Sequence, residues 1–513
     1  MRHLQIRPGV YRDSVALMRI GARLTASPGV EQALVAMATP VNVELLAGLG
    51  LDPPVDAGPN DLMIAVVADS DEALAAALDT VERELAAPTL TSSTSDAGIP
   101  AVAPRTTASA ARRVSGGSAH RFRSGELRGI ALVSTPGPYA FVEAVDALEA
   151  GLSVMVFSDN VPVEQEVCLK QRAYGQGLLV MGPDCGTAVI GGVGLGFANV
   201  VRPGPVGLVA ASGTGAQQVM ALLAAAGVGV SHCLGVGGRD LSDVVGGLST
   251  LAALDALDAD PDTELIVVLS KPPSPTVAAA VREQAARLAT PVEIALLGED
   301  GPDLTAAAAT VLTRLGVAVP GWPSWPPVPA TGSAVAAMNG SGTSRPGWLH
   351  GLFGGGTLCV EAQAVAAPIL GPVYSNVPLR PEWTVHSVRD GHVLLDLGAD
   401  EFTAGRPHPM LDPAARLPAL AASAARPEVA VVLLDVVLGH GAHPDPASVL
   451  APAIAEARRR PEPLSIVVSL VGTPDDPQGL TRQATALAEA GAHVHLSNAE
   501  AARQAARLAG GEA

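Results

Sequence analysis

Glycine and hydroxyl residues interrupt the chain where an apolar run, 207–211, passes into a helix-like segment, 216–227. A glycine-rich turn of this kind leaves backbone N–H groups uncovered, and a helix that begins there adds roughly half a positive charge. Phosphate and carboxylate groups are the ligands that such a turn favours. A similar junction recurs further along the chain. The predicted phosphate ligands are Ser212, Gly213, Thr214 and Gly215 in the first turn and Gly354, Gly355, Gly356 and Thr357 in the second.

Neither turn is a P-loop, because no G-x-x-x-x-G-K-[S/T] motif is present and no lysine follows the glycines. The alternative interpretation is a tight strand-to-helix turn whose hydroxyl residue caps the helix. Spacing alone favours the two interpretations equally.

A phosphate group held only by backbone dipoles needs a cation beside it. In the middle of the chain only Arg239 and Lys271 lie at the ends of strand-like runs. The proline-rich segment 401–413 (EFTAGRPHPMLDP) offers Arg406 and His408 on a stiff loop. We expect Arg406 to bind phosphate through its guanidinium fork and His408 to donate to an oxyanion or carry a proton.

The alternative for this segment is a surface turn in which Arg406 pairs with Glu401 or Asp412. Spacing leaves both interpretations open.

Five β-branched apolar runs in the middle block predict parallel strands buried on both faces, at 129–136, 153–159, 177–184, 206–212 and 265–271. Ligands of parallel sheets bind beyond the carboxyl ends of the strands. These ends therefore predict a substrate pocket at Thr135, Asp184, Cys185, Gly238 and Arg239 and a catalytic carboxylate at Asp240.

Composition excludes several classes of function. The chain has 513 residues and a net charge of −18, which argues against nucleic acid as a partner. Its four cysteines form no C-x-x-C pair, so neither a metal site nor a disulfide framework is expected. No apolar run reaches 18 residues and the start lacks a leader pattern, so we expect no membrane partner and a cytoplasmic location.

The alternation of strand-like and helix-like segments predicts an α/β protein with doubly wound parallel sheets, preceded by a small α+β domain. Two stretches rich in Ser, Thr, Pro, Gly and Ala, 87–126 and 319–347, are typical of linkers, with a functional lid as the alternative. In the first block, Asp69, Ser70 and Asp71 are expected to cap the last helix.

Three stretches of the middle block carry a family resemblance. Residues 179–199, 204–219 and 235–247 resemble the succinyl-CoA synthetase α-subunit, and the C-terminal block resembles the carboxyl-terminal domain of its β-subunit. With the small leading domain and the FTAGRPHPMLDP segment, nearly the whole chain resembles the FdrA family. The resemblance to the synthetase family implies two helices aimed at a phosphohistidine, which by position would begin at Ser212 and near Gly398.

The resemblance also implies a division into domains. It gives a ferredoxin-like domain at 1–86, a linker at 87–126, a CoA-binding-like Rossmann domain at 127–205, a flavodoxin-like domain at 206–318, a linker at 319–347 and a C-terminal ligase-CoA-like flavodoxin domain at 348–513.

The chain departs from the synthetase pattern in three respects. No histidine occurs between His232 and His350, no ATP-grasp segment is present, and no glycine-rich turn for a CoA nucleotide precedes residues 129–136. CoA binding is therefore doubtful, and no cofactor is required.

Some FdrA-family members resemble subunits of oxamate carbamoyltransferase, which interconverts oxalurate plus phosphate with oxamate plus carbamoyl phosphate. The expected function is that transfer, with phosphate and carbamoyl phosphate as substrates, in allantoin and purine nitrogen catabolism. The alternatives are an acyl-CoA synthetase subunit and a non-catalytic anion-binding subunit. We expect small anionic substrates and either a homo-oligomer or a complex with partner subunits.

Overall fold

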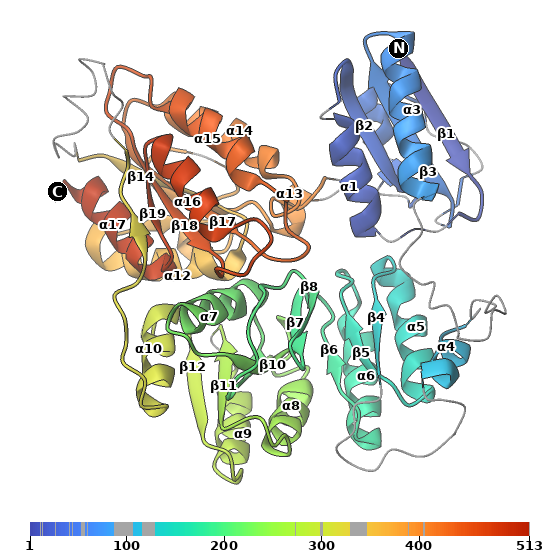
Figure 1. Ribbon diagram of the computed structural model, residues 1–513, viewed down its shortest axis with the longest axis vertical. Coiled ribbons are helices and arrows are strands. Elements are labelled where there is room, and N and C mark those ends of the chain that lie inside the picture. Colours follow the sequence, from blue (N-terminus) through green and yellow to red (C-terminus); the bar gives the residue numbers. More distant parts are fainter. Residues whose placement is uncertain are drawn as a thin grey trace.

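In the computed structural model, residues 1–511 are described except 11, 13, 26, 40–41, 44, 53–56, 59, 87–105, 115–128, 272, 298–300, 329–345, 388 and 404–405. Figure 1 shows a small N-terminal domain, in blue, standing beside three further α/β bodies. The doubly wound α/β class predicted from the alternation of elements is confirmed, including the small leading domain.

The N-terminal domain packs two helices and a 3₁₀ turn on a three-stranded antiparallel sheet of order β1-β3-β2. The Ser70 hydroxyl accepts a hydrogen bond from the Ala73 N–H at 3.2 Å, which confirms the predicted cap. The elements are β1 (Arg2–Arg7), α1 (Ser14–Thr25), β2 (Val30–Met37), η1 (Leu45–Leu49), β3 (Leu62–Ala68) and α3 (Asp71–Ala86).

The second body is a parallel sheet of order β4-β5-β6 with its helices beside it. Helix α4 lies inside the segment 87–126 that was predicted as a linker. Its Ala111 is buried in the core of this body, so this part of the segment belongs to the folded domain. The residues of that segment on either side of the helix lie mostly outside the described ones. The elements are α4 (Thr107–Val114), β4 (Ile130–Val133), α5 (Gly137–Glu149), β5 (Ser153–Val156), α6 (Val163–Gln176) and β6 (Val180–Met181).

The third body has the strand order β12-β11-β9-β10-β7-β8. Hairpin β7–β8 was expected with the preceding domain, but β7 pairs antiparallel with β10 and so extends this sheet instead. The elements are β7 (Thr187–Ile190), β8 (Val193–Gly196), β9 (Val206–Ala210), α7 (Gly213–Ala225), β10 (Val230–Gly235), α8 (Leu248–Asp258), β11 (Leu265–Ser270), α9 (Pro275–Ala285), β12 (Val292–Leu296) and α10 (Leu304–Arg314).

The C-terminal body is a seven-stranded sheet of order β13-β19-β18-β17-β14-β16-β15. Its edge strand β13 comes from the predicted linker 319–347 and pairs antiparallel with β19. Most of that segment, 329–345, lies outside the described residues. The elements are β13 (Ser324–Trp325), β14 (Trp348–Phe353), α12 (Gly356–Leu370), β15 (Val373–Tyr374), η2 (Pro381–Trp383), β16 (His392–Asp396), α13 (Asp400–Thr403), η3 (Pro413–Arg416), α14 (Leu417–Ala424), β17 (Val429–Val437), α15 (Pro446–Ala457), β18 (Ser465–Val471), α16 (Leu480–Glu489), β19 (Ala492–His495) and α17 (Asn498–Gly510).

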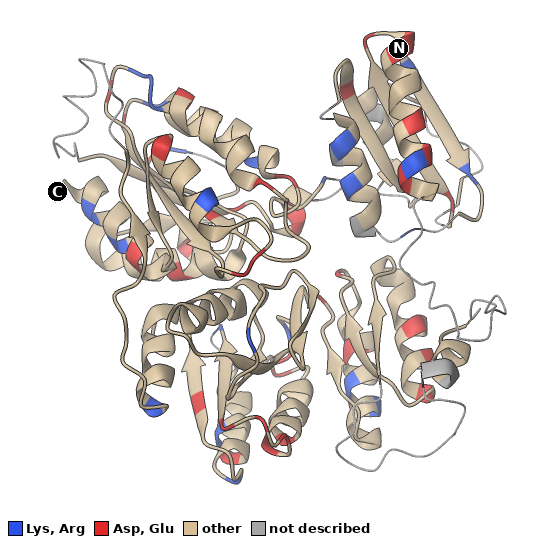
Figure 2. Ribbon diagram, in the orientation of Figure 1, with Lys and Arg blue, Asp and Glu red and all other residues tan. Residues whose placement is uncertain are grey.

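The third and C-terminal bodies share one hydrophobic core. Side chains of α7 and α10 belong to the same buried cluster as those of β14, α12 and α17. The Gln218 side chain extends this contact, because its amide donates to the Leu496 carbonyl and its oxygen accepts from the Asn498 N–H, both at 3.0 Å. Helix α7 carries no charged residue and lies along this boundary (Figures 1 and 2).

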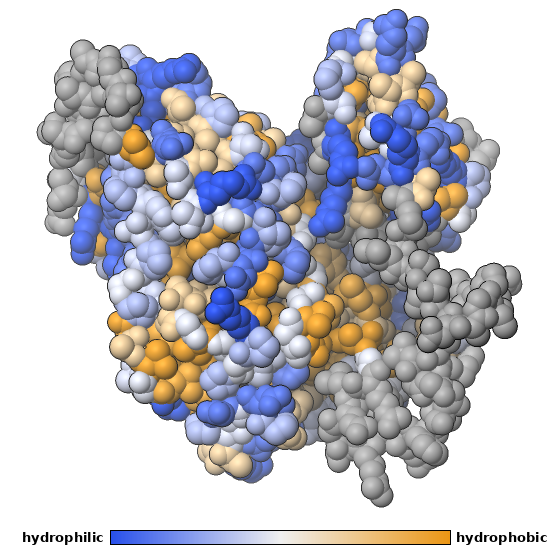
Figure 3. Space-filling view, viewed as in Figure 1, coloured by the Kyte–Doolittle hydropathy of each residue, from blue (hydrophilic) through white to orange (hydrophobic). Residues whose placement is uncertain are grey.

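The described helices include none that is both long and apolar enough to cross a membrane. On the face shown in Figure 3, hydrophilic residues predominate over the N-terminal domain, whereas hydrophobic residues gather around the position of α10.

Candidate functional site

The N-termini of α7 and α12 meet at the boundary between the third and C-terminal bodies. The Ser212 hydroxyl donates a hydrogen bond of 2.6 Å to the Thr357 hydroxyl. Any side chain at Gly355 would place its Cβ 2.9 Å from Cγ2 of Thr214, so the absence of a side chain permits this approach. The two glycine-rich turns predicted from the sequence therefore form one site.

Some of the amides in these turns already have acceptors. The Gly215 N–H donates to the Ser212 hydroxyl at 3.0 Å, which confirms the helix-cap interpretation for that serine. The N–H groups of Gly354 and Gly355 donate to the Asp435 carboxylate at 2.7 and 2.8 Å.

Other amides at the two termini are free to bind an anion. Within the described ranges, the N–H groups of Gly213, Thr214, Gly356 and Thr357 have no hydrogen-bond partner. Gly213 and Gly356 are also the partly exposed positions of the two turns. A small anion between the two helices would therefore find two sets of unpaired N–H groups and two helix dipoles.

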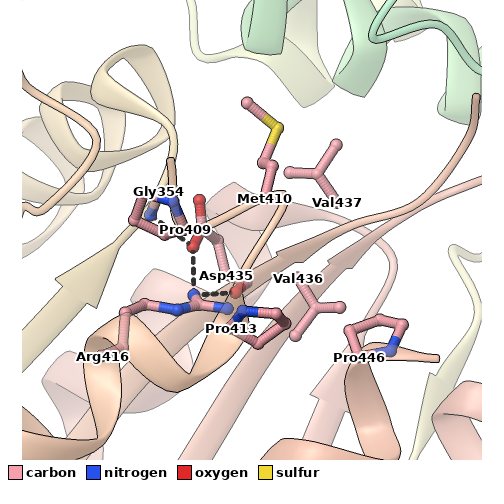
Figure 4. Close-up of a pocket in the computed structure, with 9 residues that line it drawn as sticks. All are labelled: Gly354, Pro409, Met410, Pro413, Arg416, Asp435, Val436, Val437 and Pro446. Carbon is pink, nitrogen blue, oxygen red and sulfur yellow. Dashed lines mark hydrogen bonds and ion pairs between the residues drawn. The ribbon is translucent and has the colours of Figure 1, made fainter. Parts of the chain in front are cut away.

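Asp435 is held by a buried arginine beneath the start of α12. Arg416 Nη1 lies 2.8 Å from Asp435 Oδ1, and both side chains are almost fully buried (Figure 4). Burial raises the pKa of Asp435, while Arg416 and the N–H groups of Gly354 and Gly355 act against that rise. The pair fixes the turn before α12 and leaves Gly356 facing the site.

Lys271 is the cation next to Gly356. A Cβ at Gly356 would lie 4.0 Å from Lys271 Nζ and 2.5 Å from Asp396 Oδ2. Lys271 is exposed and directly follows β11. The chain contains two lysines, and the other, Lys170, is fully buried. Lys271 is thus placed to neutralise an anion between the helices.

Carboxylates surround this lysine. Burial raises the pKa of Asp396 to about 6. The Gly398 N–H donates to its Oδ1 at 3.0 Å and partly opposes this rise. The pKa of Asp184 is also raised to about 6, first by desolvation and then by Asp159 and Asp400. Asp184 has a left-handed backbone, with φ 58°. An anion must therefore bind near groups that repel it unless they are protonated.

Affinity for an anion should depend on pH for that reason. Asp184 and Asp396 lose their charge as the pH falls through about 6, so repulsion decreases and the affinity should rise. Sulfate, which remains a dianion in this range, should bind about tenfold more tightly at pH 5.5 than at pH 8. Calorimetric titration would measure this, and Asp396→Asn should flatten the pH profile. A constant affinity in the parent protein would contradict the assignment.

Of the two predicted side chains Arg406 and His408, only His408 lies beside the residues of the anion site. A Cβ at Gly398 would lie 2.5 Å from His408 Nε2, so the imidazole packs against the loop after β16. The Met410 N–H donates to Nδ1 at 3.2 Å, and burial lowers the pKa of His408 to about 4. Arg406 is exposed and makes no ion pair with any described residue.

The helix that opposes α7 differs from the one that the family resemblance implied. It is α12, which begins at Gly356, and not a helix near Gly398. Helix α13, which begins at Asp400, has four residues and two carboxylates in its first turn. Acidic side chains there would repel a phosphate group.

Asp240, predicted as a catalytic carboxylate, lies in a buried network instead of an open pocket. Lys170 Nζ contacts Asp240 Oδ1 and Glu166 Oε1, both at 2.8 Å. Asp240 Oδ2 accepts from the N–H of Thr250 at 2.9 Å, at the start of α8. Its carboxylate has no exposed surface, so the observed contacts are structural.

The remaining predicted pocket residues lie at strand ends, as expected. Arg239 Nη2 pairs with Glu166 Oε2 at 2.9 Å and donates to the Val161 carbonyl. Gly238 lies in the loop after β10, and the closest atom to a Cβ there is the Ala211 carbonyl oxygen at 4.0 Å. The Thr135 hydroxyl is buried and has no hydrogen-bond partner in the part of the chain that the structure describes.

Cys185 is fully buried, and desolvation raises the pKa of its thiol. A thiol with a raised pKa is a poor nucleophile at neutral pH. Cys185→Ser should therefore retain most of the activity, measured as kcat/KM. A loss of about a thousandfold, of the size that removal of a nucleophile causes, would show that the thiol reacts.

Sequence reasoning missed the two carboxylates of the site. Asp435 lies within the apolar run of β17 and Asp396 at the end of β16, and a charged residue inside a buried strand was the available signal. Lys271 was recognised as a cation at a strand end, but Arg406 was predicted to bind the phosphate.

Comparison with known proteins supports a ligase-like architecture. Residues 352–508 match the family described as CoA-ligase. The chain is 39% identical over 452 residues to "Uncharacterized protein YahF" of Escherichia coli (strain K12), covering 86% of this chain and 84% of that protein. A succinate–CoA ligase [ADP-forming] subunit alpha of Methanothermobacter thermautotrophicus is 29% identical over 143 residues, 27% of this chain and 47% of that subunit.

Among solved structures, the dinucleotide-forming acetyl-coenzyme A synthetase 1 of Ca. Korarchaeum cryptofilum, in complex with phosphate and ADP, overlaps with a TM-score of 0.29 and 16% identity. That overlap covers 75% of this chain and 83% of that one, and it is too loose to carry an argument.

Residues 1–99 match the family described as AllF, heavy metal-associated domain. Thiolates are among the ligands that soft metal ions prefer, and the first cysteine of this chain is Cys168. No cluster of three or more His, Cys, Asp or Glu side chains within the described ranges could hold a metal ion. Residues 1–99 therefore offer no thiolate ligand.

Proposed function

Because the chain belongs to the family of the Escherichia coli protein YahF, and its C-terminal part is CoA-ligase-like, we propose that it is an acid–CoA ligase-like subunit that handles a phosphate or acyl phosphate group. One observation carries the proposal. The N-termini of α7 and α12 meet with unpaired amides at Gly213 and Gly356, beside Lys271. The ATP-binding part would come from a partner subunit.

The reaction that these residues can support without ATP is acyl exchange between a thioester and phosphate. A phosphate oxygen attacks the acyl carbon, the carbon–sulfur bond breaks, and the phosphate proton passes to the departing thiolate. The products are an acyl phosphate and free CoA. The amides of Gly213 and Gly356 would orient the phosphate, and Lys271 would offset its charge.

A second candidate is carbamoyl transfer of the oxamate type. The loop after β11 carries Lys271 and no histidine, and no histidine occurs between His232 and His350. A transfer that proceeds directly between phosphate and an amide nitrogen needs no phosphohistidine. This absence favours the transferase over a complete phosphoryl relay.

Labelling of Lys271 tests the shared premise without any assumption about the reaction. Lys170 is buried, so once the exposed thiol of Cys168 has been alkylated, trinitrobenzenesulfonate should modify Lys271 and the α-amino group of Met1. Phosphate should slow modification of Lys271 about tenfold relative to chloride at equal ionic strength, with Met1 as the internal reference. Equal labelling rates with and without phosphate would contradict the site.

Two assays then separate the reactions. Hydroxylamine traps an acyl phosphate formed from acyl-CoA and phosphate, and phosphate release from carbamoyl phosphate plus oxamate reports carbamoyl transfer. Gly213→Val should abolish whichever activity is present, because a Cβ there fills the approach and lies 3.0 Å from the Thr187 hydroxyl. Protection of Lys271 with neither activity would identify a non-catalytic anion-binding subunit and refute both reactions.

A further inference from the structure

A cavity of about 290 Å³ lies between the loop that precedes α10 and the helices α12 and α17, outside the site formed by the two helix N-termini. Its walls include Val360, Ala364 and Val365 from α12 and Arg503 and Arg507 from α17. Leu297 and Asp303 of the third body also line it, so both bodies contribute to the cavity. A cavity of this size is at the lower end for binding small molecules.

Of the charged lining groups that the structure describes, all but one already have a partner. Asp303 forms an ion pair with Arg503, and its Oδ1 accepts from the Ala306 N–H at 2.7 Å. Glu361 accepts hydrogen bonds from the Leu304 N–H and from Asn498 Nδ2, and burial raises its pKa to about 7.

Arg507 is the lining charge without a partner within the described ranges. It lies one helical turn from Arg503 on α17, so the two guanidinium groups face the same space. The described lining carries two basic and two acidic side chains, and Arg507 is the basic one that none of the acidic side chains neutralises.

The opposite wall is apolar. Val360, Ala364 and Pro368 recur at spacings of four residues along α12, and Leu297 adds a further apolar side chain. A ligand that matches both walls carries an anionic head and a hydrocarbon chain.

We propose that this cavity binds a small carboxylic acid with an unbranched apolar chain of about four to eight carbons. The carboxylate pairs with Arg507, aided by Arg503, and the chain lies against Val360 and Ala364. The site is distinct from the anion site, because the residues that line it begin one turn beyond Thr357 along α12.

Calorimetry with octanoate tests the proposal on the full chain. Octanoate should bind with a Kd of about 0.1–1 mM. Octanol, which has the chain without the charge, and inorganic phosphate, which has charge without the chain, should each bind at least about tenfold more weakly than octanoate. Binding of octanol equal to that of octanoate would show that only an apolar surface is involved.

Variants locate the binding. Arg507→Ala should weaken octanoate about tenfold, and Ala364→Trp should abolish binding by filling the cavity. Asp303→Asn should tighten it, because Arg503 is released while asparagine still caps α10. Arg459→Ala, at an exposed pair with Glu456, is the matched control and should change nothing.

Undiminished octanoate binding in both Arg507→Ala and Ala364→Trp would overturn the proposal, as would no binding to the parent protein at 5 mM, about five times the upper limit of the expected Kd. If Ala364→Trp does not fold, Val365→Asp takes its place, because a carboxylate on the cavity wall repels the ligand. Gly213→Val should leave octanoate binding intact, so that failure of the anion site and failure of this cavity remain distinguishable.

Discussion

Replacement of Lys271 by methionine should lower kcat/KM by about a hundredfold or more, for phosphate in the acyl exchange assay or for carbamoyl phosphate in the carbamoyl transfer assay, whichever reaction the parent protein catalyses. Lys271 Nζ lies beside the start of α12, where Asp396 would otherwise repel the anion. Methionine keeps the length of the side chain and removes the charge. Initial rates at varied concentration of phosphate or of carbamoyl phosphate, respectively, measure the loss.

Two further variants identify the cause of that loss. Lys271→Arg should recover part of the activity, because the charge returns with a different geometry. Arg287→Met, at an exposed pair with Glu283 in the same body, should behave as the parent protein does. Full activity of Lys271→Met would remove the lysine from the site.

Lys170→Met should reduce the free energy of unfolding by about 3–5 kcal/mol, the cost of removing one member of a buried ion-pair network. Lys170 Nζ contacts the carboxylates of Glu166 and Asp240 and donates to the Val236 carbonyl, all within 2.9 Å. Its loss leaves two buried carboxylates facing each other across the boundary between α6 and the loop after β10. Urea denaturation followed by circular dichroism would measure the change.

Arg172→Met is the matched control, since Arg172 lies on the same helix and pairs with Glu149 at the surface. That change should alter stability by no more than about 0.5 kcal/mol. Similar effects of the two substitutions would mean that the buried network contributes no more than an exposed ion pair.

The local pattern of apolar residues and glycines was sufficient to predict the strands and helix starts that form the site. The apolar runs at 206–212 and 265–271 became β9 and β11, and the glycine turns became the starts of α7 and α12. Both junctions are strand-to-helix transitions, where hydrophobic period and turn chemistry change within a few residues.

Contacts between side chains far apart in the chain could not be predicted from the sequence. The hydroxyl contact between Ser212 and Thr357 joins residues 145 positions apart, and no periodicity encodes it. Asp435 reaches the turn before α12 from the middle of a buried strand. Composition also misjudged the segment at 319–347, because strand β13 is two residues long and is stabilised by its partner β19.

The core shared by the third and C-terminal bodies has a consequence for how the anion site is assembled. The two helix N-termini come from bodies joined by one covalent segment, residues 319–347, so their encounter is intramolecular and its effective concentration reaches about the millimolar range. Dilution cannot separate them. A chain cleaved within that segment should stay together through its buried apolar surface, and two fragments expressed apart should recombine into an active pair.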